Sequence, residues 1–296
     1  MPPLASDLVA EVKRFLYSGF QDEMNELDGA VSTTTGAILN LRHDPIGVAR
    51  GTILSIDLEE MMVWAVSQRQ VTVRRAMNGS TAATHPDGSL VHVRPKFTDY
   101  RILTAINDEL RDLSSPQNGL YVMRTTDITL ATRLSYELPA DFIEIYEIRE
   151  APGASSLYAP WRLKSFDVAR GMNTADVGSG NLLIMHETPM PGTRLTLRYK
   201  AAFTLLTGLT QDVPAVTGLP PTATDIPPLG AAIRLVAPRD VKRSFTEPQG
   251  EPRRAEEVPP GSAGASIRPL AALKQQRLVA EAARLQAMYP PLLVMR

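Results

Sequence analysis

The chain has 296 residues, and its 31 Lys and Arg against 32 Asp and Glu give a formal net charge of −1. A balance this close to zero gives no overall sign of a nucleic-acid or membrane-surface protein. With 44% hydrophobic and 21% charged residues, the chain has an ordinary globular composition and enough length to bury a core. It contains no cysteine, which excludes disulfides, thiolate metal sites and cysteine nucleophiles.

The charge is unevenly spread along the sequence. From Arg234 to Arg296, eleven Lys and Arg stand against six Asp and Glu, a local excess of +5, which leaves −6 for the rest. This excess fits an electrostatic contact with a partner, and it fits ordinary helix-surface charges equally well. The first residues show no secretory signal pattern, and no apolar run approaches the roughly 20 residues that would span a bilayer.

The first third of the chain predicts one helix followed by short strands. Leu4, Leu8, Val12 and Leu16 recur at helical spacing and predict a helix over residues 4–18, ending near Gly19 or continuing brokenly to Leu27. Alternating apolar runs then predict five strands, at residues 38–41, 52–56, 61–66, 71–73 and 90–93. So many short strands in so few residues indicate a small barrel or a compact two-sheet module.

A second helix and a second set of strands follow. Thr98 is a good N-cap, and the apolar stripe through Leu103, Ile106 and Leu110 predicts a helix over residues 99–113. Strand patterns return between residues 120 and 206, and these predict a second β-domain with a looser stretch at residues 151–180.

The last third predicts two helices separated by Pro- and Gly-rich segments. They are expected at residues 227–245, where Pro238 should kink or end the helix, and at residues 267–289. After Pro290-Pro291, the apolar tail LLVMR either folds back on the protein or docks on a partner.

The predicted fold is therefore α+β: a bundle of about four helices with an inserted small β-barrel-like module and a second β-domain. The expected divisions are the first part of the bundle at 1–30, the β-module at 31–96, a bundle helix at 97–117, the second β-domain at 118–206, and the Pro-rich connection, C-terminal helices and docking tail at 207–296. Each helix has one apolar face, so the helices are expected to find one another.

The sequence offers little sign of chemistry. His85-Pro86-Asp87 with His92 matches no metal-ligand spacing and reads more simply as a turn. There is no G-x-S-x-G nucleophile motif and no phosphate-binding loop. The acidic doublets Glu59-Glu60 and Glu256-Glu257 are predicted in turns and solvated, and Arg74-Arg75 reads as an isolated basic doublet. We therefore expect no catalytic residues, no cofactor and no metal, and hence a protein that is not an enzyme.

One long stretch resembles a known family. The run EMMVWAVSQRQVTVRRAMNGSTAATHPDGSLVHV, from Glu60 to Val93, is similar to a pattern in head-to-tail connector proteins of tailed bacteriophages. The matching residues are Val73, Arg74 or Arg75, Asn78, Gly79, Ser80, Ala82, Ala83, His85, Gly88 and Val91. The chain departs from the pattern at Arg74-Arg75-Ala76, where Arg-Gly is usual.

The resemblance continues beyond that run. It includes Phe97-Thr98 with the helix ILTAINDELRDL, the segment LSYELPADFIEIYEI, and a C-terminal third similar to actinophage-type versions. Together these segments cover about two thirds of the chain, and their order is more specific than any single one.

The resemblance implies a structural adaptor in the virion neck, assembled in the host cytoplasm. Adjacent copies would form a ring, expected to be a dodecamer, beneath the portal protein and above a stopper or tail protein. Double-stranded DNA would pass through its lumen without specific contacts, and no membrane would be involved. Portal contact is expected near the C-terminus, at Arg277, Arg284, Tyr289, Leu292, Leu293, Val294, Met295 and Arg296. The alternatives are another neck or tail component, such as a stopper or tail-completion protein, or a host-surface-binding module.

Overall fold

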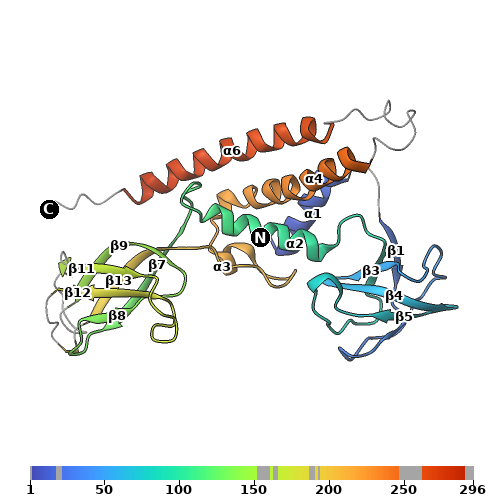
Figure 1. Cartoon of the computed structure of the whole chain (residues 1–296), viewed down its shortest axis with the longest axis horizontal. Coiled ribbons are helices and arrows are strands. Elements are labelled where there is room, and N and C mark those ends of the chain that lie inside the picture. Colours follow the sequence, from blue (N-terminus) through green and yellow to red (C-terminus); the bar gives the residue numbers. More distant parts are fainter. Residues whose placement is uncertain are drawn as a thin grey trace. The chain divides into compact units, whose positions relative to one another are not determined.

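The computed structural model describes residues 2–17, 22–151, 161–162, 166–186, 191–192, 194–246 and 262–290. The chain combines helices and strands, so the prediction of an α+β protein is confirmed (Figure 1). It divides into two compact units. Unit 1 comprises Met1–Leu110 and Leu205–Arg277, and unit 2 comprises Arg111–Thr204 and Leu278–Arg296.

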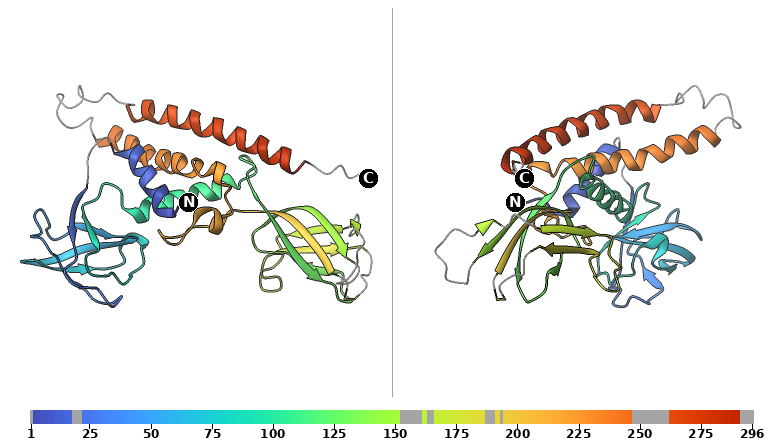
Figure 2. Two further views of the ribbon diagram at one scale, coloured as in Figure 1. Left: turned by 180° about the vertical axis from the view of Figure 1, so that it is seen from behind. Right: turned by 60° about the vertical axis from the view of Figure 1, so that its left-hand side comes forward.

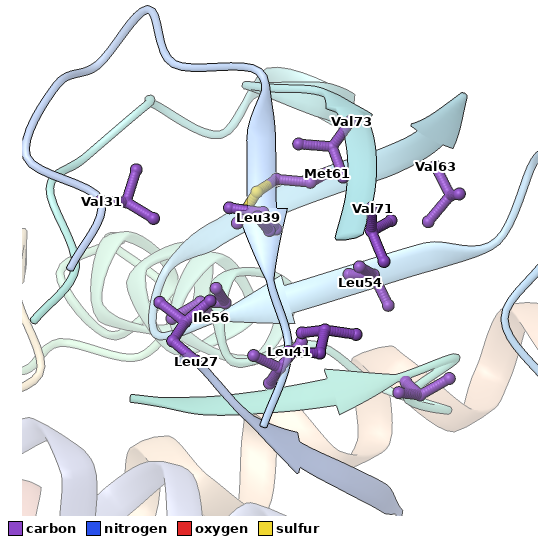
Figure 3. Close-up of a cluster of buried hydrophobic side chains, with 12 residues drawn as sticks. Leu27, Val31, Leu39, Leu41, Leu54, Ile56, Met61, Val63, Val71 and Val73 are labelled. Atoms are coloured by element: carbon purple, nitrogen blue, oxygen red, sulfur yellow. The ribbon is translucent and has the colours of Figure 1, made fainter. Parts of the chain in front are cut away.

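A six-stranded antiparallel sheet forms the β-part of unit 1, with strand order β1-β6-β3-β4-β5-β2. Its strands are β1 (Glu23–Glu26), β2 (Ile38–Asn40), β3 (Ile53–Ile56), β4 (Glu59–Ser67), β5 (Gln70–Arg74) and β6 (Leu90–Val93). The sheet curls, and a bridge between Leu27 and Leu41 joins the chain just beyond its two edge strands. Twelve buried apolar side chains fill the concave side, among them Leu39, Leu54 and Val71 (Figure 3).

Five of these strands match the predicted ones to within about two residues, because each has the alternation that a half-buried strand needs. The sixth strand, β1, was missed. Its sequence, EMNE, buries only Asn25 and carries charge at both ends, so it has no strand-like apolar pattern. Because β1 follows α1 so soon, the option of a broken helix continuing to Leu27 is wrong.

Four helices match the predicted ones to within about five residues at either end, whereas a fifth, short helix lies in the stretch that was expected to be a Pro-rich connection. They are α1 (Ala5–Leu16), α2 (Asp99–Leu113), α3 (Val213–Thr217) and α4 (Ile226–Thr246), with α6 (Ser262–Met288) reaching into unit 2, and short 3-10 turns η1 (Met77–Gly79) and η2 (Pro221–Ala223). α1 packs against α4 through a face that includes Leu8 and Val12. α4 does not end at Pro238, although proline cannot donate to the carbonyl four residues earlier.

Unit 2 contains two packed antiparallel sheets (Figure 2). One has the order β10-β9-β13-β7 and the other β11-β12-β8. The strands are β7 (Val122–Thr129), β8 (Ser135–Glu137), β9 (Phe142–Ala151), β10 (Trp161–Arg162), β11 (Phe166–Arg170), β12 (Asn181–Met185) and β13 (Arg194–Ala201). Leu195 and Leu197 from the first sheet share one core with Tyr136 and Leu183 from the second. β11 lies in the stretch that the sequence indicated as loose.

A buried carboxylate holds three helices of unit 1 together. Glu109 on α2 is fully buried, and its Oε2 lies 3.1 Å from Nε of Arg234 on α4. Its Oε1 pairs with Nζ of Lys274 on α6. α4 approaches this carboxylate closely at Gly230, where a Cβ would overlap Cγ, Cδ and Oε2 of Glu109.

We therefore expect Gly230→Ala to lower the free energy of unfolding by about 1–3 kcal/mol, the usual cost of overpacking. On a helix face with free space around it, the same change would stabilise the folded state, because alanine has a higher helix propensity than glycine. Here Glu109 has no room to move because two cations fix it. Chemical denaturation measures the effect. The matched control is Gly208→Ala, whose Cβ would meet only Gln211 at 3.9 Å and should change little.

Candidate functional site

Four polar residues of the stretch between Val71 and Val91 gather around two adjacent carboxylates on β4: Arg75, Asn78, Ser80 and His85. Glu59 and Glu60 are 1% and 0% exposed, so the prediction that they are solvated in a turn is wrong. β4 begins at Glu59, two residues before the predicted strand, and its neighbours supply donors that no local pattern reveals.

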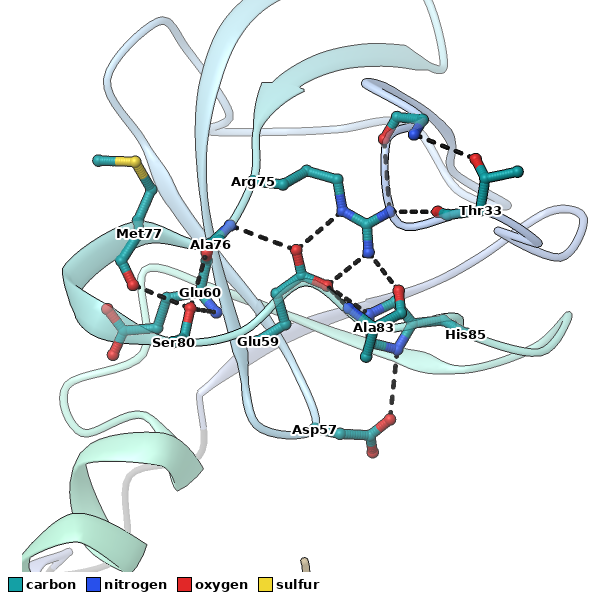
Figure 4. A network of polar contacts seen from close by, with 11 residues as sticks. Thr33, Asp57, Glu59, Glu60, Arg75, Ala76, Met77, Ser80, Ala83 and His85 are labelled. Atoms are coloured by element: carbon teal, nitrogen blue, oxygen red, sulfur yellow. Dashed lines mark hydrogen bonds and ion pairs between the residues drawn. The ribbon is translucent and has the colours of Figure 1, made fainter. Parts of the chain in front are cut away.

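Arg75 and His85 surround Glu59 (Figure 4). Nε of Arg75 donates to Glu59 Oε1 at 2.8 Å, and Nε2 of His85 lies 3.0 Å from Glu59 Oε2. The backbone N–H of Ala83 also donates to Oε2, at 2.9 Å. The remaining donors of the guanidinium reach the carbonyls of Thr33, at 2.6 Å, and of Ala83. One ion pair thus ties β4, β5 and two loops together.

The network shifts the pKa values of Glu59 and His85. Burial opposes ionisation of Glu59, but hydrogen bonds from His85, Arg75 and Ala83 and the charge of Arg75 lower its pKa to about 2. Burial likewise opposes the charged form of His85. Hydrogen bonds to Asp57 and Glu59 and the charges of both carboxylates outweigh it and raise the pKa of His85 to about 8. Near neutral pH the network therefore holds a carboxylate between two cations.

Glu60 points to the other side of the strand and binds a different part of the chain. Its Oε1 accepts from the Thr98 hydroxyl, at the N-cap of α2, and its Oε2 from the amide of Asn78. Nε of Arg101, on the first turn of α2, lies 3.4 Å from Oε1. Oγ of Ser80 accepts from the Glu60 N–H at 3.0 Å. Glu60 therefore fastens the sheet to the start of α2.

This arrangement is poorly suited to catalysis. The Ser80 hydroxyl donates to the Met77 carbonyl at 2.8 Å, and the two ring nitrogens of His85 face Glu59 and Asp57. The structure thus places no base beside the hydroxyl, and the groups serve to hold the loop over residues 76–89 on β4. Across the described ranges, no group of three or more His, Cys, Asp or Glu side chains is arranged to bind a metal ion.

Three of the predicted portal-contact residues lie in the described parts of the chain, and each has partners within its own unit. Arg277, in unit 1, pairs with Asp225, with Nε 2.6 Å from Oδ2. Arg284, in unit 2, donates from Nε to Glu281 at 2.8 Å. Both cations therefore have partners within the chain. Five further predicted positions lie outside the described residues: Leu292, Leu293, Val294, Met295 and Arg296.

Tyr289 packs within unit 2, where sequence reasoning expected a contact with the portal. Its ring centroid lies 5.9 Å from that of Tyr146 and 6.5 Å from that of Tyr121. The Tyr146 hydroxyl donates to the Pro290 carbonyl at 3.2 Å, and Nζ of Lys200 lies 5.0 Å from the Tyr121 ring centroid. The end of α6 is thus fastened to the strands by a tyrosine cluster whose members lie too far apart in the sequence for any local pattern to indicate it.

No protein-family model matches the chain, and no curated protein is significantly similar to it. Among the described helices, none has the length and apolar character needed to cross a membrane. The family resemblance therefore rests on the quoted motifs alone.

Glu59→Gln should lower the free energy of unfolding by about 3–5 kcal/mol, because it leaves buried Arg75 and protonated His85 without their counter-charge. Denaturant titration measures the loss. Glu23→Gln removes the same charge from an exposed position on β1 and should cost less than about 0.5 kcal/mol. Equal unfolding midpoints for the two variants would contradict a stabilising role for the network.

Stability should also depend on pH through His85. Its folded pKa, about 8, lies above its ordinary 6.5, so its contribution is complete below pH 6.5 and lost as pH rises through about 8. Glu59 acts oppositely: its contribution is complete above pH 4.5 and lost as pH falls toward about 2.

We expect unfolding free energy to fall by on the order of 1–2 kcal/mol between about pH 6 and pH 9. Denaturation of the wild type at both pH values measures this change. The same measurement on His85→Asn should show most of the decrease abolished, and an unchanged decrease in that variant would assign it to other groups.

Proposed function

We propose that the protein is a structural component of a tailed-phage virion: a head-to-tail adaptor that forms a ring beneath the portal and extends the DNA channel toward the tail. The ordered series of motifs from Glu60 to the C-terminal third supports this proposal. The proposal takes the ring to be a dodecamer.

The observation that carries the proposal is that the motif residues shape a loop and hold it in place. Ser80 and His85 are buried in the polar network, and Asn78, Gly79 and Gly88 have φ values of 54°, 88° and 76°. Such positive φ angles favour Gly and Asn and set the turns of the loop. A motif whose residues shape a loop and fasten it to a helix suits a protein that holds neighbours in place.

We further propose that the helices form the ring's core. The bundle of the proposal consists of α1, α2, α4 and α6, with the six-stranded sheet and the second β-domain as insertions. Neighbouring copies would bury helix faces and sheet edges against one another. DNA passing through the lumen would make transient, non-specific contacts.

The portal contact is assigned to the end of the chain. Arg277, Arg284 and Tyr289 have partners within the chain. The proposal therefore places the main contact at residues 292–296, whose sequence is LLVMR. These apolar residues with a terminal Arg would add binding energy by burial against the portal.

Electron microscopy of the full chain mixed with its portal protein is the direct test. We expect a ring coaxial with the portal in negative-stain images. A ring that binds the tail-side protein and ignores the portal would indicate a stopper or tail-completion protein. A monomer that binds a host-surface glycan would overturn the proposal in favour of a host-binding module.

A chain ending after Pro290 should fold but lose attachment to the portal. The truncation keeps Tyr289 in its tyrosine cluster and the carbonyl of Pro290 for Tyr146, so the folded units should remain intact. Co-sedimentation with portal measures attachment, and circular dichroism with thermal unfolding checks the fold. The control is Tyr289→Phe in the full chain, which keeps both ring and tail and should bind normally. Co-sedimentation of the truncated chain at the wild-type level would refute the assignment.

A further inference from the structure

The convex face of the six-stranded sheet carries an exposed tryptophan. Trp64 on β4 is 54% exposed, as is Ile38 on β2. Exposed large apolar side chains that lie together, unlike isolated ones, indicate a surface that binds another molecule.

Trp64 is exposed because it follows the buried Val63 on β4, and successive residues of a strand face opposite sides of the sheet. A β-bulge lies at the same position. On β4, Val63 pairs with Val73 and Ala65 pairs with Thr72, so Trp64 is an extra residue in the ladder. Such a bulge re-aims a side chain relative to regular alternation. Here the residue after Trp64, Ala65, also lies on the exposed face, directly opposite Thr72.

The pairing register places further residues on the same face. Ile38 is directly opposite Thr72, and Arg74 is directly opposite Met62. Val71 and Val73, which alternate with Thr72 and Arg74, point into the core instead. The face therefore combines Ile38, Met62 and Trp64 with an arginine.

Two arginines on this face have no acidic partner in the part of the chain that the structure describes. The guanidinium carbon of Arg50 lies 4.0 Å from the ring centroid of Trp64, a cation–π contact. Arg74 is exposed, whereas the adjacent Arg75 is buried in its ion pair with Glu59. Arg69, at the end of the same hairpin, is paired with Asp44 at 3.0 Å.

We propose that this surface, made of Ile38, Arg50, Met62, Trp64 and Arg74 and called here the Trp64 surface, binds an acidic segment of a partner protein. The two arginines call for carboxylates, and the apolar side chains between them call for apolar side chains on the same segment. Trp and Arg are also the residues that most often dominate the binding energy of protein interfaces.

A nucleic acid fits this surface less well than a protein segment. Its phosphates could use the two arginines, but much of the face is aliphatic and would stay unpaired against a charged backbone. Single-strand binding sites have several stacking aromatics along a basic groove, and this face has one. The Trp64 surface belongs to the six-stranded sheet alone, so the proposal does not depend on ring formation.

The test uses the full chain and two synthetic peptides, an alternating Glu-Val peptide and its Gln-Val counterpart. The protein carries Trp161→Phe, so that Trp64 is the single remaining one of its two tryptophans. We expect the Glu-Val peptide to change Trp64 fluorescence saturably and the Gln-Val peptide to bind roughly tenfold more weakly or not at all.

Arg50→Gln with Arg74→Gln should weaken binding of the Glu-Val peptide roughly tenfold. Arg69→Gln is the matched control, because it removes the same charge from the same hairpin at a position already paired with Asp44. It should leave binding unchanged. Thermal unfolding of each variant confirms that it is folded, and calorimetric titration of Trp64→Ala provides a readout independent of fluorescence.

Three results would overturn the proposal. The first is that the two peptides bind equally well, or that neither binds. The second is a loss with Arg69→Gln as large as that of the double variant, which would mean a diffuse charge effect. The third is tighter binding of a single-stranded oligonucleotide than of the Glu-Val peptide, which would assign the surface to nucleic acid.

Discussion

Unit 1 depends on the burial of two adjacent carboxylates on one strand. Because successive residues of a strand face opposite ways, Glu59 and Glu60 cannot share the same partners. Glu59 takes Arg75, just after β5, and His85, in the following loop, whereas Glu60 takes Thr98 from the start of α2. A buried charge without a partner is very costly, so the sheet, the loop and the helix must assemble together. This requirement explains why a loop rich in turn residues has one defined conformation.

The same alternation separates Arg74, the last residue of β5, from Arg75, which follows it. Arg75 faces Glu59, and Arg74 faces solvent on the convex side. A doublet that looks uniform in the sequence thus has one member that stabilises the fold and one that is free to bind. Trp64 on β4 adds an aromatic ring on the exposed side. The two faces of one hairpin therefore differ: the buried face stabilises the fold, and the exposed face carries the residues of the proposed binding surface.

The sequence predicted those elements whose signals are local. α2 has the predicted bounds because its signals are the N-cap Thr98, immediately before the helix, and the apolar stripe through Ile106 within it. The state of Glu59 was not predictable in this way, since Arg75 is 16 residues away and His85 is 26 away. Acidic doublets are usually solvated, and only the folded arrangement shows that cations meet this one. β1 was missed for a related reason, because its pairing with β6 and not its composition makes it a strand.

A count of charges along the sequence likewise does not show which of them form ion pairs in the fold. The local excess of positive charge after Arg234 suggested an electrostatic contact, but Arg234 and Lys274 both pair with Glu109, and Arg277 pairs with Asp225. Ion pairs with acids that lie elsewhere in the sequence reduce the field that a partner would meet. These three cations therefore fasten α4 and α6 to the rest of unit 1. A partner that binds near them would therefore meet a weaker positive field than the count of charges in the sequence suggests.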